Sequence, residues 1–324
     1  MKRLSECAAM LGVWLGLLLL FGALSEKFLT LRVLGALANR IPYLTVVAAG
    51  MTLVLIIGGI DLSVGSVLGL CGAVLGVVMA DGHWPLWAGA LLCLGVGGLA
   101  GALNGLVSVR LGIPSFIVTL GMLEIARGLA YLTTHSQTKY IGAAVEGLAR
   151  PMAGGLSAAV FLAAAVVVAG QVVLSRTVLG RLIVAIGTNE AAVRLAGIDP
   201  RPIKLAVFAL VGLLTGLGAV FYTSHLGSAD PNAGVGLELS AIAAAVIGGT
   251  SLMGGRGSII NSFLGVLIIA TLQAGLAQVG ASEPVKRVVT GLVIVIAVVL
   301  DAWRHHLAAA PYPLLKRLFT KRSG

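Results

Sequence analysis

Long apolar runs, each ended by a short polar or glycine-rich stretch, repeat along almost the whole chain. A helix needs about 20 predominantly apolar residues to cross the hydrocarbon core of a bilayer. Ten segments come close to that length, at approximately residues 7–24, 41–60, 63–80, 86–109, 114–134, 155–174, 204–224, 237–253, 258–279 and 286–302. The pattern predicts an all-α polytopic membrane protein with about ten transmembrane helices in a single domain over residues 1–324.

The composition supports this class, because the 324 residues are 58% hydrophobic and 10% charged, with a mean hydropathy of +1.05. A soluble fold cannot remove that much apolar surface from water. Glycine is also abundant, with 45 residues, and glycines let membrane helices approach closely. We expect close contacts within the chain, rather than between two copies, at the spaced glycines of two predicted spans: Gly65/Gly69, Gly72/Gly76 and Gly97/Gly101/Gly105.

The N-terminus combines Lys2 and Arg3 with an apolar run that ends at Leu24. A signal peptide and a first transmembrane helix both begin in this way. The run is long enough to span and no Ala-x-Ala cleavage site follows it, so we interpret it as a first span. The three cysteines, Cys7, Cys71 and Cys93, lack metal-ligand spacing and are interpreted as small apolar residues.

Basic residues gather at the termini and in a polar loop at about residues 175–204, which holds five of the chain's 22. With ten spans, the side that carries both termini and this loop receives fourteen Lys and Arg residues, and the other side seven. Lys and Arg favour cytoplasmic loops. We therefore predict cytoplasmic termini, a cytoplasmic loop 175–204 and a basic cytoplasmic tail at 303–324. The net charge of +10 is explained as an orientation signal and not as a nucleic-acid patch.

The centre of this loop has the features of a short helix. Thr188 or Asn189 can cap its first turn, and Glu190 suits its positive end. Gly197 suits a left-handed exit, and Pro200 stops the helix. One face of the helix is apolar, with Ala191, Ala192, Leu195 and Ile198. A membrane protein that presents such a helix to the cytosol offers a docking surface.

Two glycine-rich corners, at residues 57–66 and 247–258, join spans with almost no loop. Asp61 and Ser63 can cap the helix that follows the first corner, which satisfies backbone groups that lipid cannot. Both corners are tight capped turns or, alternatively, broken helices that form the inner gate or flank the docking loop.

Glu124 and Arg127 lie near the middle of the fifth predicted span, three residues apart and therefore on one face. Charges at this depth are costly and usually face a bundle interior or a water-filled cavity. They form an ion pair with each other or line a polar solute pathway, with Asn104 of the preceding span as a possible neighbour.

Over residues 30–302 the chain resembles the permease subunits of bacterial ATP-binding-cassette importers for monosaccharides, the ribose-permease-like family. The order and spacing of several short motifs carry the resemblance: Gly50-Met51-Thr52-Leu53-Val54, Gly59-Ile60-Asp61-Leu62-Ser63-Val64-Gly65-Ser66, Asn104-Gly105, Pro114-Ser115-Phe116-Ile117-Val118-Thr119-Leu120-Gly121, Asn189-Glu190-Ala191-Ala192, Gly197-Ile198 and Gly248-Gly249-Thr250-Ser251.

The resemblance implies the type II importer architecture, in which helices two to five and seven to ten form an inverted repeat. It implies an inner-membrane location in contact with lipid, a second permease copy, two ATPase subunits and a periplasmic sugar-binding protein. The cytoplasmic helix would couple to an ATPase through Asn189, Glu190, Ala191, Ala192, Arg194, Leu195 and Gly197. The translocation path or gate would include Asp61, Ser63, Asn104, Phe116, Glu124 and Arg127.

The chain has no Gly-x-x-x-x-Gly-Lys-[Ser/Thr] phosphate loop, so a partner ATPase must supply the energy from ATP and Mg²⁺. We expect a non-catalytic subunit that binds no cofactor or metal and works by alternating access. Ribose or another pentose fits the resemblance, while a hexose or a furanose signalling molecule stays open. The alternative is a secondary transporter, in which Asp61 or Glu124 carries a proton or ion. A membrane enzyme is a third class, but no His-x-x-x-His pair or nucleophile–base arrangement supports it.

Overall fold

The computed structural model describes residues 2–152 and 154–309, and almost all of its regular structure is helical. The helices are α1 (Lys2–Leu24), α2 (Leu31–Arg40), α3 (Pro42–Ile56), α4 (Val64–Ala80), α5 (Leu86–Leu111), α6 (Ser115–Thr134), α7 (Ala143–Glu146), α8 (Ala158–Arg176), α9 (Val178–Thr188), α10 (Glu190–Leu195), α11 (Arg201–Leu226), α12 (Leu237–Ile247), α13 (Ile259–Gln278) and α14 (Glu283–Ala309). Two short strands, β1 (Lys139–Tyr140) and β2 (Ser228–Ala229), pair antiparallel.

Each of the ten predicted spans overlaps a helix, which confirms the all-α polytopic class. Six of the described helices are long and apolar enough to cross a membrane by themselves, namely α1, α5, α6, α8, α11 and α13. The bent pair α2–α3, with an angle of 46° between its parts, would make a seventh. α4 and α12 are shorter, at 17 and 11 residues. Residues 310–324 of the predicted basic tail lie outside the described residues.

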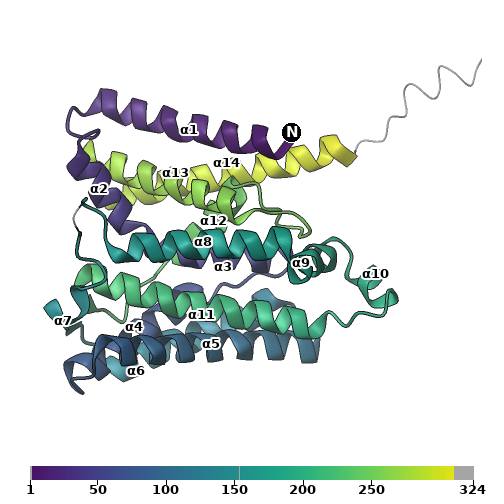
Figure 1. Ribbon diagram of the computed structural model, residues 1–324, viewed down its shortest axis with the longest axis horizontal. Coiled ribbons are helices and arrows are strands. Elements are labelled where there is room, and N and C mark those ends of the chain that lie inside the picture. Colours follow the sequence, from purple (N-terminus) through teal and green to yellow (C-terminus); the bar gives the residue numbers. More distant parts are fainter. Residues whose placement is uncertain (1, 153, 310–324) are drawn as a thin grey trace, which may run out of the picture.

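The long helices lie side by side with their axes roughly parallel (Figure 1). α1, α13 and α14 form one edge of the bundle in this view, and α4, α5 and α6 form the opposite edge. α10 projects beyond one end of the bundle, while α2 and α7 lie at the other end. The chain therefore presents different elements at its two ends, as a protein that faces two compartments must.

The most extensive helix contact joins α5 to α11, and small residues make it possible. A side chain at Gly97 would collide with the backbone of Gly212, and one at Gly101 would collide with the carbonyl oxygen of Phe208. Gly216 lies in the same way against Cys93. The predicted glycine face of the fourth span is thus a contact within the chain, where backbones pack directly against each other.

Two interruptions in the helical structure position the candidate site. We call residues 57–63, between α3 and α4, the first break, and residues 230–236, between β2 and α12, the second break. The first break lies at the end of the bundle that carries α10, and the second follows the strand pair at the other end. The segments that follow them, α4 and α12, are the two short apolar helices.

The loop predicted at residues 175–204 contains a helix that the sequence pattern missed. α9 occupies Val178–Thr188, with Thr177 accepting a hydrogen bond from the amide of Gly180 as its cap. Ile183 and Ile186 are buried against the bundle. A helix of eleven residues that includes Arg181 is too short to span a bilayer, so a search for spans assigns the segment to a polar loop.

Candidate functional site

α10 is a six-residue helix at the tip of the loop between α9 and α11. The Asn189 side chain accepts a hydrogen bond from the amide of Ala192 at 3.0 Å, so Asn189, and not Thr188, is the cap. The helix ends at Leu195, and Gly197 follows two residues later with a φ of +82°, the left-handed conformation that glycine favours. The sequence analysis expected a cap at Thr188 or Asn189 and the left-handed exit at Gly197, but Ile198, expected on the apolar face of the helix, lies beyond its end.

The apolar face expected for this helix is exposed. Leu195 has 90% of its surface accessible and Ile198 has 39%, while Ala191 and Ala192 are also exposed. Val193 points the other way and is buried. The helix is therefore held to the bundle on one side and presents small and aliphatic side chains on the other.

Glu190 connects α10 to the first turn of α11. Its carboxylate accepts hydrogen bonds from Arg194 at 2.5 Å and from Lys204 at 2.7 Å. Partial burial alone would raise the pKa of Glu190, but the hydrogen bonds and charges of Lys204 and Arg194 outweigh it and lower the pKa. The bond to Arg194 is local, whereas the bond to Lys204 ties α10 to a helix that crosses the whole bundle.

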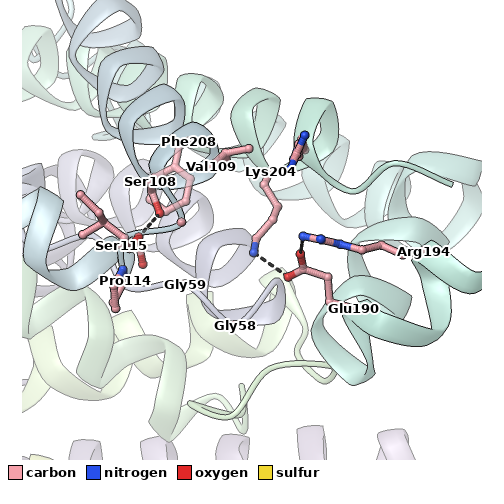
Figure 2. Close-up of a pocket in the computed structure, with 13 residues that line it drawn as sticks. Gly58, Gly59, Ser108, Val109, Pro114, Ser115, Glu190, Arg194, Lys204 and Phe208 are labelled. Atoms are coloured by element: carbon pink, nitrogen blue, oxygen red, sulfur yellow. Dashed lines mark hydrogen bonds and ion pairs between the residues drawn. The ribbon is translucent and has the colours of Figure 1, made fainter.

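A cavity of about 330 Å³ lies beneath this ion cluster. Figure 2 shows Arg194 and Lys204 converging on Glu190 on one side of the cavity, while Gly58 and Gly59 of the first break lie on the other. Three basic side chains and one acidic side chain line it, namely Arg194, Arg201, Lys204 and Glu190. α10 and the first break thus border the same space.

The end of α9 also contacts the first break. A side chain at Gly187 would collide with the carbonyl oxygen of Ile56, the last residue of α3. The same carbonyl accepts a hydrogen bond from the amide of Gly255 at 2.8 Å, and Gly255 belongs to the second glycine-rich corner. Both corners and the α9–α10 loop therefore meet at one end of the bundle.

Three of the predicted path residues form one buried network at the first break. Asp61 accepts hydrogen bonds from the amide of Ser63 at 2.8 Å and from its hydroxyl at 2.6 Å. The Asn104 amide group donates to the Ser63 hydroxyl at 2.9 Å, which joins α5 to the break. Each of the three residues is at most 2% exposed. In this conformation they stabilise the turn and do not line an open channel.

α6 holds both breaks. Ser115 and Thr119 accept hydrogen bonds from the amides of Ile60 and Leu62 in the first break, at 2.9 and 3.0 Å. Further along the helix, Arg127 donates to the carbonyl oxygens of Pro231 and Ala233 in the second break.

Arg127 and Glu124, expected either to pair or to line a pathway together, point to different surroundings. No ion pair joins them among the described residues. Arg127 instead donates hydrogen bonds to the backbone carbonyl oxygens of Pro231 and Ala233. Glu124 is exposed, as is Phe116 with 45% of its surface accessible. Both lie on the outward face of α6, together with Leu120 and Ile125.

Sequence reasoning missed two charged residues of this arrangement. Lys204, counted as an orientation charge, holds Glu190. Glu238, in the first turn of α12, lies next to Gly65 of α4, because a side chain at Gly65 would collide with its carboxylate. Glu238 comes two positions after Gly236 and could have indicated the start of a short helix, since acidic groups favour helix N-termini.

Comparison with known proteins places the chain in a family. Residues 33–298 match the family described as branched-chain amino acid transport system / permease component. The ribose import permease protein RbsC of Escherichia coli K12 is 38% identical over 88% of this chain and 90% of its own length. RbsC of Bacillus subtilis 168 is 39% identical over 90% of this chain and 92% of its own.

A relative whose name gives a different transported solute has a similar sequence identity. The autoinducer 2 import system permease protein LsrC of Enterobacter sp. 638 is 35% identical over 90% of this chain and 86% of its own length. No solved structure gives a significant match. The family match covers most of the chain and includes both breaks, α6 and α10. The chain belongs to the branched-chain amino acid transport system / permease component family.

Proposed function

We propose that this chain is the membrane subunit of an ATP-driven importer that carries a monosaccharide, ribose or a similar pentose, across the bacterial inner membrane. The family description and the ribose permease relatives support this transport role. The observation that carries the coupling mechanism is the exposed Leu195 on α10, a helix that Lys204 holds against the bundle through Glu190. An exposed apolar patch rimmed by polar residues marks a protein–protein contact.

The partner at this surface is an ATPase subunit in the cytosol. The end of the bundle that carries α10 is rich in basic residues. Five of them lie in the segment 175–204, namely Arg176, Arg181, Arg194, Arg201 and Lys204. Basic loops favour the cytoplasmic side. On this assignment both termini are cytoplasmic, and Asn189, Glu190, Ala191, Ala192, Arg194, Leu195 and Gly197 form or position the docking surface.

A second copy of the permease covers the outward face of α6. Glu124 is exposed on that face, and a carboxylate in contact with lipid tails is costly. Pairing two such faces would place Glu124 and Phe116 beside a polar path between the copies, which the sugar crosses. Asp61, Ser63 and Asn104 would act as the gate at the cytoplasmic end of this path, because they fix the first break.

Hydrolysis of ATP with Mg²⁺ would take place in the two ATPase subunits, and this chain would bind no cofactor. Closure of the ATPases would push α10, and α11 and the first break would follow because both border the same cavity. A periplasmic binding protein would deliver the sugar from the other side. The permease pair would then alternate between inward-open and outward-open states.

Reconstitution tests this function directly. The chain is placed in liposomes with the ATPase and binding protein encoded alongside it, and uptake of labelled ribose is measured with and without internal ATP. We expect uptake to require ATP and the ATPase and to resist a protonophore. Uptake that continues without the ATPase and collapses with the protonophore would instead establish an ion-coupled transporter. Competition by unlabelled fructose and autoinducer 2 would identify the sugar class.

A further inference from the structure

The second break is held in place by side chains of α6. Arg127 donates through one guanidinium nitrogen to the carbonyl oxygens of Pro231, at 2.5 Å, and Ala233, at 2.9 Å. One turn later, the Tyr131 hydroxyl donates to the Asn232 side chain at 2.7 Å. Asp230 closes the turn internally by accepting from the amide of Asn232 at 2.8 Å. Three consecutive residues of the break are therefore fixed to one helix.

Arg127 packs against α4 at Gly69, where there is no room for a side chain. A side chain at Gly69 would meet the Arg127 guanidinium at 2.8 Å and the Ala233 carbonyl oxygen at 2.9 Å. Backbone carbonyls at a helix break inside a membrane need donors, because lipid offers none. Arg127 supplies them from a planar group with several N–H donors, a geometry that lysine cannot reproduce fully.

The N-terminal part of α6 holds the first break. Ser115 and Thr119 accept from the amides of Ile60 and Leu62. Eight residues separate Thr119 from Arg127, which corresponds to about 12 Å along a helix. α6 is a continuous helix between these points, so its two ends cannot move independently without bending it.

The second break also contacts the start of α4, the helix that follows the first break. A side chain at Gly65, just after the first break, would collide with the Gly234 carbonyl oxygen of the second, and one at Gly234 would collide with the Gly65 carbonyl oxygen. Both breaks are therefore fixed to α6, and the second packs against the start of the helix that follows the first. Since such tightly packed contacts rearrange between discrete arrangements and do not deform continuously, movement of one break must affect the other.

We propose that α6 couples the two breaks, and that Arg127 is the positioning residue that transmits movement of the first break to the second. The inference rests on the proposed function, because the movement starts when the ATPases push α10. The first break borders the cavity beneath α10, and the second lies toward the opposite end of the bundle. Arg127 thereby links the ATP-driven step to opening on the side that receives the sugar.

A cysteine at position 235 reports on the second break, because Val235 is 60% exposed there. The assembled transporter carrying Val235→Cys is labelled with a membrane-impermeant maleimide, without nucleotide and with ATP and vanadate. The transporter without Val235→Cys gives the background, which Cys7 can contribute because it is partly exposed, whereas Cys71 and Cys93 are buried. We expect the labelling rate to differ between the two states by about fivefold or more, a common size of coupling between sites.

Adding Arg127→Leu should reduce this difference to less than about twofold, and Arg127→Lys should restore part of it. Leu91→Ala, on the exposed side of α5, should keep the full difference. Co-purification of the ATPase and thermal stability in detergent establish that each variant is folded and assembled. A purely structural role would lower stability without changing the ratio between the two states.

The outcomes separate this inference from the function on which it rests. An assembled Arg127→Leu transporter with the full nucleotide-dependent difference would overturn the role of Arg127 alone. Absence of any nucleotide-dependent labelling in the parent Val235→Cys transporter would overturn the ATP-driven function, and the inference with it. If Arg127→Leu fails to assemble, the Tyr131→Phe variant removes a neighbouring contact to the second break and must reduce the difference; full retention would overturn the inference.

Discussion

Glu190 of α10 and Lys204 of α11 form an ion pair of 2.7 Å across 14 residues of sequence, and this pair joins a short exposed helix to one that crosses the bundle. The neighbouring hydrogen bond from Arg194 joins two residues of α10. It therefore orients the Glu190 carboxylate but does not connect α10 to the bundle. A force applied to α10 therefore has a direct route into α11 through Lys204.

Breaking this pair should impair uptake far more than stability. The side chains of Glu190 and Lys204 are 31% and 26% exposed, and exposed pairs contribute about 0–1 kcal/mol to stability. Glu190→Gln and Lys204→Met should therefore leave thermal stability in detergent nearly unchanged and lower ATP-driven uptake by about tenfold, while hydrolysis continues. Arg194→Gln should uncouple less. Wild-type uptake in both the Glu190 and the Lys204 variants would contradict the route.

The same pair predicts a pH dependence. The pKa of Glu190 is lowered from its ordinary value of 4.5, so the folded state favours the charged carboxylate. Its contribution to stability is present above pH 4.5 and disappears as the pH falls through the lower folded-state pKa. The small difference in melting temperature between the parent protein and Glu190→Gln should stay constant at neutral pH and vanish in acid. A difference that grows on acidification would contradict this sign.

The sequence predicted the helices because long apolar runs are a strong local signal. Local residue types likewise predicted a cap at Thr188 or Asn189 and an exit at Gly197, and the structure identifies Asn189 as the cap. It could not predict where Arg127 would bond. Its acceptors lie 104 and 106 residues away, while Glu124 was near in sequence. α12 illustrates the other limit: residues 237–253 have the composition of a span, but the helix ends at Ile247, before Gly248 and Gly249. The apolar composition of a segment does not determine the residue at which its helix ends.

A charge placed on the exposed face of α10 should prevent docking of the ATPase. Leu195 is 90% exposed, so Leu195→Asp adds no buried charge to the isolated chain and should not affect its insertion. At an apolar interface the same carboxylate would lose its water, which costs several kcal/mol. We expect Leu195→Asp to abolish co-purification of the ATPase.

Leu31 offers a matched control, since it is also 90% exposed but lies at the start of α2, at the opposite end of the bundle. Leu31→Asp should co-purify with the ATPase as the parent does. Equal retention of the ATPase by the Leu195→Asp protein would show that the docking surface lies elsewhere.

The α5–α11 contact should not tolerate even one added methyl group. In Gly97→Ala the new Cβ collides with the Gly212 backbone, which cannot rotate away as a side chain can. Overpacking of this kind typically costs about 1–3 kcal/mol, so the melting temperature in detergent should fall clearly. Gly95 lies two residues away in the same helix with nothing within 4 Å of the position its Cβ would take. Gly95→Ala should be neutral, and a similar loss in both variants would contradict the packing explanation.

Asp61 distinguishes ATP-driven import from ion-coupled transport. Its carboxylate accepts two hydrogen bonds from Ser63, and an asparagine amide oxygen can accept the same bonds without carrying a proton or binding a cation as a carboxylate does. If Asp61 stabilises the first break, Asp61→Asn should retain most ATP-driven uptake, whereas Asp61→Ala should lose uptake because the turn is no longer capped. A transporter that uses Asp61 to carry a proton or ion would lose uptake in both variants. Measurements of uptake and assembly in the two proteins therefore decide whether this buried acid holds the gate or carries charge.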